Sequence, residues 1–85
     1  MRKIAFLPAA FEDMKRWSTL DPKIYEKIKA LLKDMEPDPF SQLGDPEPLK
    51  HELTGLWAKR LNEEHYLIYK ITDEEIVIVS CRFYH

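Results

Sequence analysis

Residues 66–82, Tyr-Leu-Ile-Tyr-Lys-Ile-Thr-Asp-Glu-Glu-Ile-Val-Ile-Val-Ser-Cys-Arg, decide the fold class of this chain. Two runs rich in Ile, Val, Leu and Tyr, residues 66–71 and 75–82, flank the polar segment 72–74. β-Branched and aromatic residues favour strands, and a brief polar segment between two such runs is typical of a turn. The sequence therefore predicts two adjacent antiparallel strands here.

A third strand is predicted over residues 56–61, connected to residue 66 by a turn at 62–64. Successive side chains of a strand point to opposite faces of the sheet. The strand therefore divides its residues into two sets, Leu56, Ala58 and Arg60 on one face, and Trp57, Lys59 and Leu61 on the other. The three strands form a β-meander.

Two helices are predicted ahead of the meander. The first spans 9–19, after Pro8, where apolar side chains recur at helical spacing: Phe11, Met14 and Trp17. The second begins at Asp21-Pro22, an N-cap acceptor followed by proline at the first helical position, and ends before Pro37. Its apolar residues form one face: Ile24, Ile28, Leu31, Leu32 and Met35.

Residues 2–7 predict a short first strand that joins the sheet. The chain is therefore expected to be one α+β domain spanning residues 1–85. We expect an N-terminal strand and a two-helix hairpin packed on an antiparallel sheet of about four strands. The only cysteine, Cys81, follows an apolar run, so we expect it near the core and not as a reactive thiol.

The overall charge argues against broad, non-specific binding of nucleic acid, because the net charge is −2 and the pI is near 5.9. A local basic site is still compatible with the sequence, because basic residues gather within 50–60: Lys50, His51, Lys59 and Arg60. No apolar run approaches the roughly 20 residues of a membrane span, and no apolar stretch of a signal peptide follows the N-terminal basic residues. We therefore expect a soluble, cytoplasmic protein without a membrane partner.

Residues 37–54 contain four of the six prolines and one of the two glycines, so no regular element is expected there. In so small a domain, a long irregular segment is either functional or disordered. Pro46 and Pro48 restrict the backbone on both sides of Glu47, which stiffens the position of its carboxylate.

The same segment carries groups suited to RNA cleavage. Glu47, Lys50 and His51 supply a carboxylate, an ammonium and an imidazole within five residues, and the guanidinium of Arg60 follows. Attack by the 2'-hydroxyl of RNA needs a base for that proton, an acid for the leaving 5'-oxygen, and cations for the charge on the phosphorane. Such a reaction requires no metal and no cofactor. For an arbitrary glutamate, a solvated position without function is the commoner situation.

The whole chain resembles one family from end to end, at the following positions: Ile4-Ala5-Phe6, Trp17, Lys27-Ile28, Pro39-Phe40, Glu47-Pro48-Leu49-Lys50-His51, Leu53-Thr54-Gly55-Leu56-Trp57, Glu63-Glu64-His65, Leu67-Ile68-Tyr69 and Cys81-Arg82. The family is that of the YoeB-like toxins of the RelE superfamily, which cleave messenger RNA inside the ribosome. The resemblance implies a RelE-like fold, a cognate antitoxin, the ribosome and mRNA as partners, in many members a homodimer, and no metal or cofactor.

The resemblance also implies roles for individual residues. Glu47 falls at the general base, and Lys50 and Arg60 fall at groups that stabilise the transition state. The family pattern has a second arginine where this chain has Tyr66. We expect Tyr66 to bind the substrate, where its ring could stack on a base. Further substrate contacts are expected from His51, Lys59 and Arg82.

The chain end departs from the family pattern. The family ends in an aromatic residue, then His, then Tyr, whereas this chain ends Phe83-Tyr84-His85. Tyr84 therefore stands where the catalytic histidine is expected and would help to place the substrate. The general acid is then His85 or His51, since imidazole titrates near neutral pH.

Two alternatives stay open at the level of sequence. The first is a binding protein that keeps the scaffold and the antitoxin surface while catalysis is attenuated, as Tyr66 and Tyr84 suggest. The second is a RelE-fold relative that poisons gyrase, against which Glu47 and Lys50 argue. Arg60 also has a purely structural alternative, a surface ion pair with Glu63 or Glu64.

Overall fold

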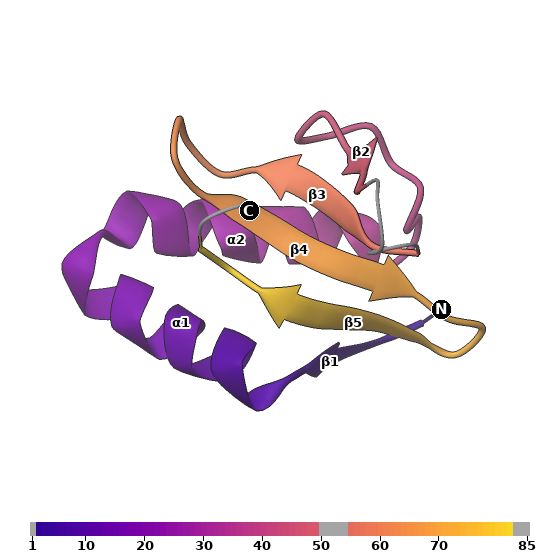
Figure 1. Ribbon diagram of the computed structural model, residues 1–85, viewed down its shortest axis with the longest axis horizontal. Coiled ribbons are helices and arrows are strands. Elements are labelled where there is room, and N and C mark those ends of the chain that lie inside the picture. The colour runs from indigo at the N-terminus through magenta and orange to yellow at the C-terminus, as the bar shows by residue number, and fades with distance from the viewer. Residues whose placement is uncertain (1, 50–54, 83–85) are drawn as a thin grey trace.

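The computed structural model describes residues 2–49 and 55–82 of the chain. Two helices lie on one side of a single twisted sheet (Figure 1), and α2 passes behind the sheet in that view. The elements in chain order are β1 (Lys3–Phe6), α1 (Pro8–Leu20), α2 (Pro22–Met35), β2 (Glu47–Pro48), β3 (Trp57–Arg60), β4 (Tyr66–Ile71) and β5 (Glu75–Ser80). The expected α+β class and the β-meander of β3, β4 and β5 are confirmed.

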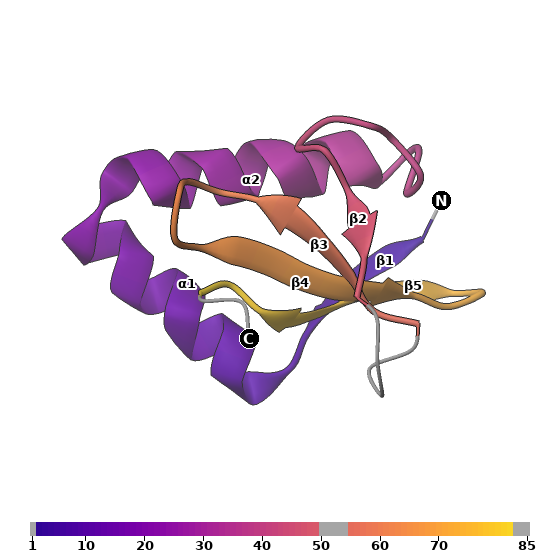
Figure 2. The same cartoon turned by 45° about the horizontal axis from the view of Figure 1, so that its top comes forward.

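The sheet has five strands in the order β1-β5-β4-β3-β2, so the expectation of about four antiparallel strands is corrected. β1 pairs with β5 in parallel, whereas the other three pairs are antiparallel. After β1 the chain passes through both helices and enters the sheet again at the opposite edge, at β2 (Figure 2). It then returns strand by strand until β5 lies beside β1 and parallel to it. Such long-range pairing leaves no signal in the local sequence pattern.

β2 is the second correction, because no regular element was expected within residues 37–54. It comprises only Glu47 and Pro48, which pair with Ala58 and Trp57 of β3. Proline has no N–H for a strand ladder and is confined to sheet edges. Pro46 and Pro48 therefore keep β2 short and at the edge.

The helices begin where the sequence indicates. Pro22 stands in the first turn of α2, and the Asp21 carboxylate accepts a hydrogen bond from the backbone N–H of Lys23 at 3.1 Å. The predicted apolar face of α2 is confirmed, because Ile24, Ile28, Leu31 and Met35 are buried. This face packs in the main core against side chains of the sheet, among them Leu67, Tyr69, Ile76 and Ile78.

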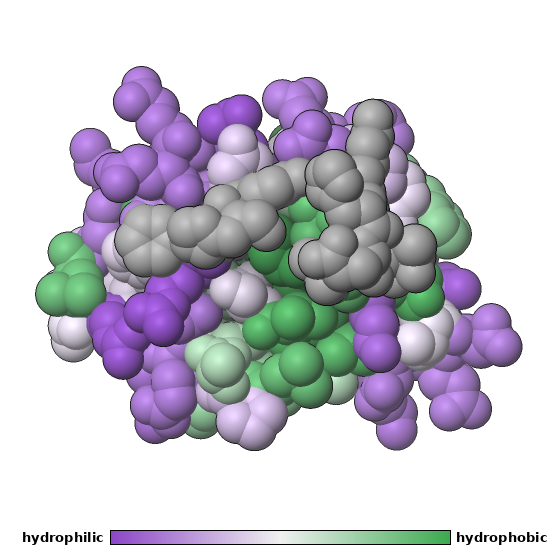
Figure 3. Space-filling view, viewed as in Figure 1, coloured by the Kyte–Doolittle hydropathy of each residue, from purple (hydrophilic) through white to green (hydrophobic). Residues whose placement is uncertain are grey.

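A smaller apolar cluster lies on the opposite face of the sheet, away from the helices. It comprises Leu49, Ala58 and Ile68, with Leu56, Tyr66 and Val79 packed partly buried against it. Figure 3 shows apolar surface in the middle of this face and polar surface around its rim. This face, called the open face below, carries the candidate site. Within residues 2–49 and 55–82, no helix is long and apolar enough to cross a membrane.

Candidate active site

Glu47 stands on the edge strand β2 with an exposed side chain. Its cross-strand partner is Ala58, and the backbone N–H of Leu49 donates to the carbonyl of Leu56 at 2.8 Å, which fixes the register of β2 on β3. Directly paired residues share a face of the sheet. Glu47 therefore lies on the open face with Ala58, and with Arg60 two residues further along β3.

Arg60 is paired across the strands with Tyr66 of β4. The central carbon of the guanidinium lies 4.9 Å from the centroid of the Tyr66 ring, and Nη1 donates to the carbonyl of Asn62 at 3.4 Å. A guanidinium at this distance from an aromatic face is attracted by the ring electrons. Although Glu63 and Glu64 belong to the described residues, neither forms an ion pair with Arg60. The ring of Tyr66 therefore orients Arg60.

Lys59 lies on the other side of the sheet from Arg60. Its side chain is fully buried, and Nζ donates to the carbonyl of Ser41 at 3.1 Å. Burial lowers the pKa of the Lys59 ammonium, and the carboxylates of Asp34 and Asp38 oppose that shift in part. The structure therefore separates Lys59 from Glu47 and Arg60, as the alternation along the strand predicts, although Lys59 was expected among the substrate contacts.

The segment between α2 and β2 packs directly on this lysine. Gly44 has a φ of +85°, and a Cβ added there would come within 3.0 Å of Leu31 Cδ2 and 3.2 Å of Lys59 Cβ. The carbonyl of Gly44 accepts a hydrogen bond from the backbone N–H of Arg60 at 3.0 Å. A glycine is required here both by the left-handed backbone and by the close approach to β3.

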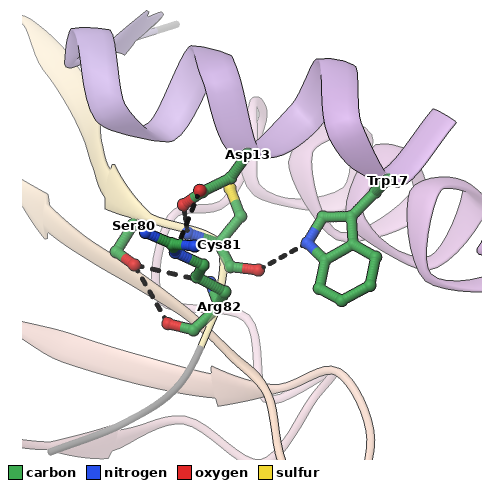
Figure 4. Close-up of polar contacts among 5 residues, drawn as sticks. All are labelled: Asp13, Trp17, Ser80, Cys81 and Arg82. Carbon is green, nitrogen blue, oxygen red and sulfur yellow. Dashed lines mark hydrogen bonds and ion pairs between the residues drawn. The ribbon is translucent and has the colours of Figure 1, made fainter. Parts of the chain in front are cut away.

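The end of β5 is held by α1 (Figure 4). Asp13 is buried, its Oδ2 accepts a hydrogen bond from the backbone N–H of Cys81 at 3.0 Å, and its Oδ1 forms an ion pair with Arg82 Nε at 3.3 Å. The indole N–H of Trp17 donates to the carbonyl of Cys81 at 2.8 Å. Both backbone groups of Cys81 are thereby bound to one helix, immediately before the chain end.

Asp13 was missed by the sequence analysis. A signal was present, because Asp13 stands four residues before Trp17 and therefore shares a helix face with that apolar residue, whereas its neighbour Glu12 does not. A buried carboxylate requires partners, so its position on that helix indicated an interaction with another part of the chain. Its partner Arg82 was expected at the substrate, and half of the arginine side chain, 52%, is exposed beside the ion pair.

Two other ionisable groups are deeply buried. Burial, with a smaller effect from Asp13, raises the pKa of the Cys81 thiol from 9.0 to about 12, and burial raises the pKa of Tyr69 from 10.0 to about 12. Cys81 therefore stays protonated near neutral pH and is a core residue, as predicted.

The structure thus brings together Glu47, Arg60 and Tyr66 on the open face. Four candidates lie outside the described residues: Lys50, His51, Tyr84 and His85. Among the described residues, no three His, Cys, Asp or Glu side chains are grouped to hold a metal ion.

A small apolar hollow of about 80 Å³ opens elsewhere, under the segment that follows α2. Its lining includes Pro39, Phe40, Trp57 and Tyr69, and none of the candidate site residues. It therefore contributes nothing to the chemistry of the open face.

Comparison with known proteins identifies the family. The model for YoeB-like toxins of bacterial type II toxin–antitoxin systems matches residues 6–85. The chain belongs to this family. It is 40% identical over 83 residues to the toxin YoeB of Escherichia coli strain K12, which covers 98% of this chain and 99% of that protein. The YoeB resemblance found in the sequence is confirmed.

Solved YoeB structures share the fold. The structure of the YoeB dimer from Staphylococcus aureus superposes with a TM-score of 0.90 at 40% identity, covering 99% of this chain and 98% of that one. A heterotetrameric YoeB–YefM toxin–antitoxin complex from the same organism matches with a TM-score of 0.87 at 40% identity, covering 100% and 99%. The RelE-like arrangement expected from the resemblance is therefore confirmed, and the chain is a YoeB-like toxin of a type II toxin–antitoxin system.

Proposed function

We propose that this toxin is a ribosome-dependent mRNA endoribonuclease that uses the 2'-hydroxyl of the RNA as its nucleophile. One observation carries the proposal: Glu47 and Arg60 lie on the same open face, on two strands whose register is fixed by hydrogen bonds. Diagonal neighbours on adjacent strands are roughly 7–8 Å apart. That spacing leaves room for a 2'-hydroxyl and the adjacent phosphate between a base and a cation.

The proposed reaction needs few groups. The Glu47 carboxylate removes the proton of the 2'-hydroxyl, the 2'-oxygen bonds to phosphorus, and the bond from phosphorus to the 5'-oxygen breaks. The departing 5'-oxygen takes a proton from His85 or His51. The products are a 2',3'-cyclic phosphate and a 5'-hydroxyl. The reaction consumes no water and requires no metal ion.

The charge that builds on the phosphorane is stabilised by Arg60 and Lys50. A planar guanidinium presents two parallel donors to two oxygens, and its position over Tyr66 is already set before the substrate arrives. The exposed part of Arg82 is a further phosphate contact, while Asp13 holds its Nε. Tyr84 helps to place the substrate. Lys59 is not included, because its ammonium is buried on the other side of the sheet.

The partners follow from the family. By analogy with the YoeB–YefM toxin–antitoxin complex, an antitoxin binds this toxin, and a homodimer is proposed by analogy with the Staphylococcus aureus YoeB dimer. The ribosome presents the mRNA, since a net charge of −2 provides little affinity for free RNA. With these partners, we propose a cytoplasmic location.

The test is cleavage of mRNA on programmed ribosomes, followed by analysis of the fragment ends. We expect a 2',3'-cyclic phosphate on the upstream fragment and a 5'-hydroxyl on the downstream fragment, with the same mRNA uncut in the absence of ribosomes. A 5'-phosphate would rule out attack by the 2'-hydroxyl.

A second function is favoured by one observation, the tyrosine at position 66 in place of a second cation. In that case the chain is an antitoxin-binding protein with attenuated catalysis. It would form the antitoxin complex, yet leave mRNA on programmed ribosomes intact.

A further inference from the structure

Lys59 is an unusual residue for the interior of so small a domain. Its side chain is fully buried, although lysines are almost never fully buried unless they are paired. Within residues 2–49 and 55–82, no carboxylate lies within ion-pair distance of Nζ. The hydrogen bond of Nζ to the carbonyl of Ser41 is the contact that the structure gives this ammonium.

The buried side chain supports the segment between α2 and β2. The ammonium holds this segment at Ser41, and the aliphatic stem of the lysine packs against Gly44, where an added Cβ would lie 3.2 and 3.3 Å from Lys59 Cβ and Cδ. The segment has little support of its own. Its local hydrogen bonds are short-range turns, such as those of the Ser41 N–H to the Asp38 carbonyl and of the Asp45 N–H to the Gln42 carbonyl.

Three consecutive residues of β3 therefore hold this segment at three points. Lys59 binds the carbonyl of Ser41, the N–H of Arg60 binds the carbonyl of Gly44, and Ala58 pairs with Glu47. Lys59 reaches Ser41 from the buried face of β3, whereas Ala58 and Arg60 contact the segment through their backbone at the edge of the sheet. The segment is therefore held on the buried side at Ser41 and along the edge at Gly44 and Glu47.

We propose that Lys59 is a positioning residue for the active site. Its ammonium fixes the segment around Ser41 and Gly44, and thereby keeps β2 in the register that sets Glu47 beside Arg60. This inference rests on the proposed function, because it assigns Lys59 to the placement of the proposed base. An apolar side chain of similar length would fill the same space but offer no donor to the Ser41 carbonyl.

The experiment compares Lys59→Met, Lys59→Arg and a matched control, Lys27→Met, which makes the same change at an exposed position of α2. Backbone hydrogen exchange is measured at residue resolution, together with kcat and KM on programmed ribosomes. Lys59→Met should accelerate exchange at the amides of Ser41, Asp45 and Arg60 by at least about tenfold and leave β4 and β5 protected.

In the same variant, kcat should fall by about 10–100-fold with little change in KM, since misplacement of a reacting group affects the chemical step. Lys59→Arg keeps a donor and should retain most of the protection and activity, and Lys27→Met should match the wild type. Unchanged exchange and kcat in Lys59→Met would overturn the inference. So would equal acceleration across β4 and β5, because Lys59 would then stabilise the whole domain.

The outcome separates this inference from the proposed function. If Glu47→Gln cleaves as fast as the wild type, the proposed function fails, whereas exchange in Lys59→Met still reports whether the lysine holds the segment. If Glu47→Gln cleaves slowly while Lys59→Met cleaves at the wild-type rate, the proposed function stands and only the positioning role of Lys59 is contradicted.

Discussion

Glu47 and Arg60 lie on one face of the sheet because Glu47 is the cross-strand partner of Ala58, two residues from Arg60. A shift of β2 by one residue would turn Glu47 to the opposite face, because side chains alternate along a strand. The chemistry proposed for this toxin therefore depends on the register of a two-residue strand. That register depends in turn on the hydrogen bonds made by Leu49 and Gly44.

Gly44→Ala tests the tight contact that supports β2. The substitution forces a Cβ to within 3.0 Å of Leu31 in a backbone with φ of +85°. Gly55→Ala is the matched control, because Gly55 has the same φ and no atom of residues 2–49 and 55–82 lies within 4 Å of an added Cβ there. In urea unfolding, both variants should lose about 1–2 kcal/mol of stability because the backbone is left-handed at these positions. Gly44→Ala should lose more than Gly55→Ala. Equal losses would show that the packing at Gly44 adds nothing.

Tyr66→Arg tests whether a second cation is missing from the site. An added fixed charge near the phosphorane should raise the cleavage rate. If it acts like other charge-stabilising donors, it lowers the activation barrier by up to a few kcal/mol. Tyr66→Phe should cleave at the wild-type rate, because its ring still orients Arg60. A rate that stays level or falls in Tyr66→Arg would instead indicate that Tyr66 stacks on the substrate.

Asp13→Ala tests the attachment of the chain end to α1. It removes the acceptor of the Cys81 N–H and the partner of Arg82, so it should lower the free energy of unfolding by about 1–3 kcal/mol. Asp13→Asn retains one acceptor oxygen and should lose less. Glu12→Ala, which removes an exposed carboxylate paired with Lys15, should cost about 0–1 kcal/mol. Equal urea midpoints for Asp13→Ala and Glu12→Ala would contradict this role.

Alkaline pH should destabilise the fold through Tyr69 and Cys81. Both pKa values are raised to about 12 in the folded state, from 10.0 and 9.0. The folded state therefore retains protons that the unfolded chain loses, so their stabilisation is complete below about pH 9 and is lost as pH rises toward 12. Lys59 acts in the opposite direction, because its pKa is lowered.

The measurement for this prediction is the urea midpoint of wild type, Tyr69→Phe and Cys81→Ala between about pH 8 and pH 11. At about pH 8, neither variant should be more stable than the wild type. As the pH rises, each variant should lose less stability than the wild type does. Parallel curves for all three proteins would show that neither group is responsible.

Local signals predicted much of this molecule. The Asp21-Pro22 start, the apolar face of α2 and the alternation at residues 56–61 each depend on neighbours within a few residues, and the structure follows them. The alternation also placed Arg60 and Lys59 on opposite faces. The parallel pairing of β1 with β5 depends on residues more than 70 positions apart, so it left no trace in any local pattern.

The candidate site was only partly predictable for the same reason. Glu47 and Arg60 were selected as candidates by their chemistry and by the family resemblance, and their roles stay predictions. The burial of Lys59 results from the packing of Gly44 and Ser41 on β3, which a sequence rich in proline and glycine does not specify. Asp13 was recognisable as an acid on an apolar helix face, but its partners at the end of β5 required the tertiary structure.

The most direct test of the account is the rate of mRNA cleavage on programmed ribosomes by the wild type and by Glu47→Gln. Glutamine keeps the shape of the exposed side chain at the sheet edge and removes the base, so folding and antitoxin binding should be unchanged. We expect the cleavage rate to fall by about 10²–10⁴-fold, the usual contribution of general acid–base catalysis. Equal rates for the two proteins would contradict the assignment of Glu47 as the base and with it the proposed mechanism.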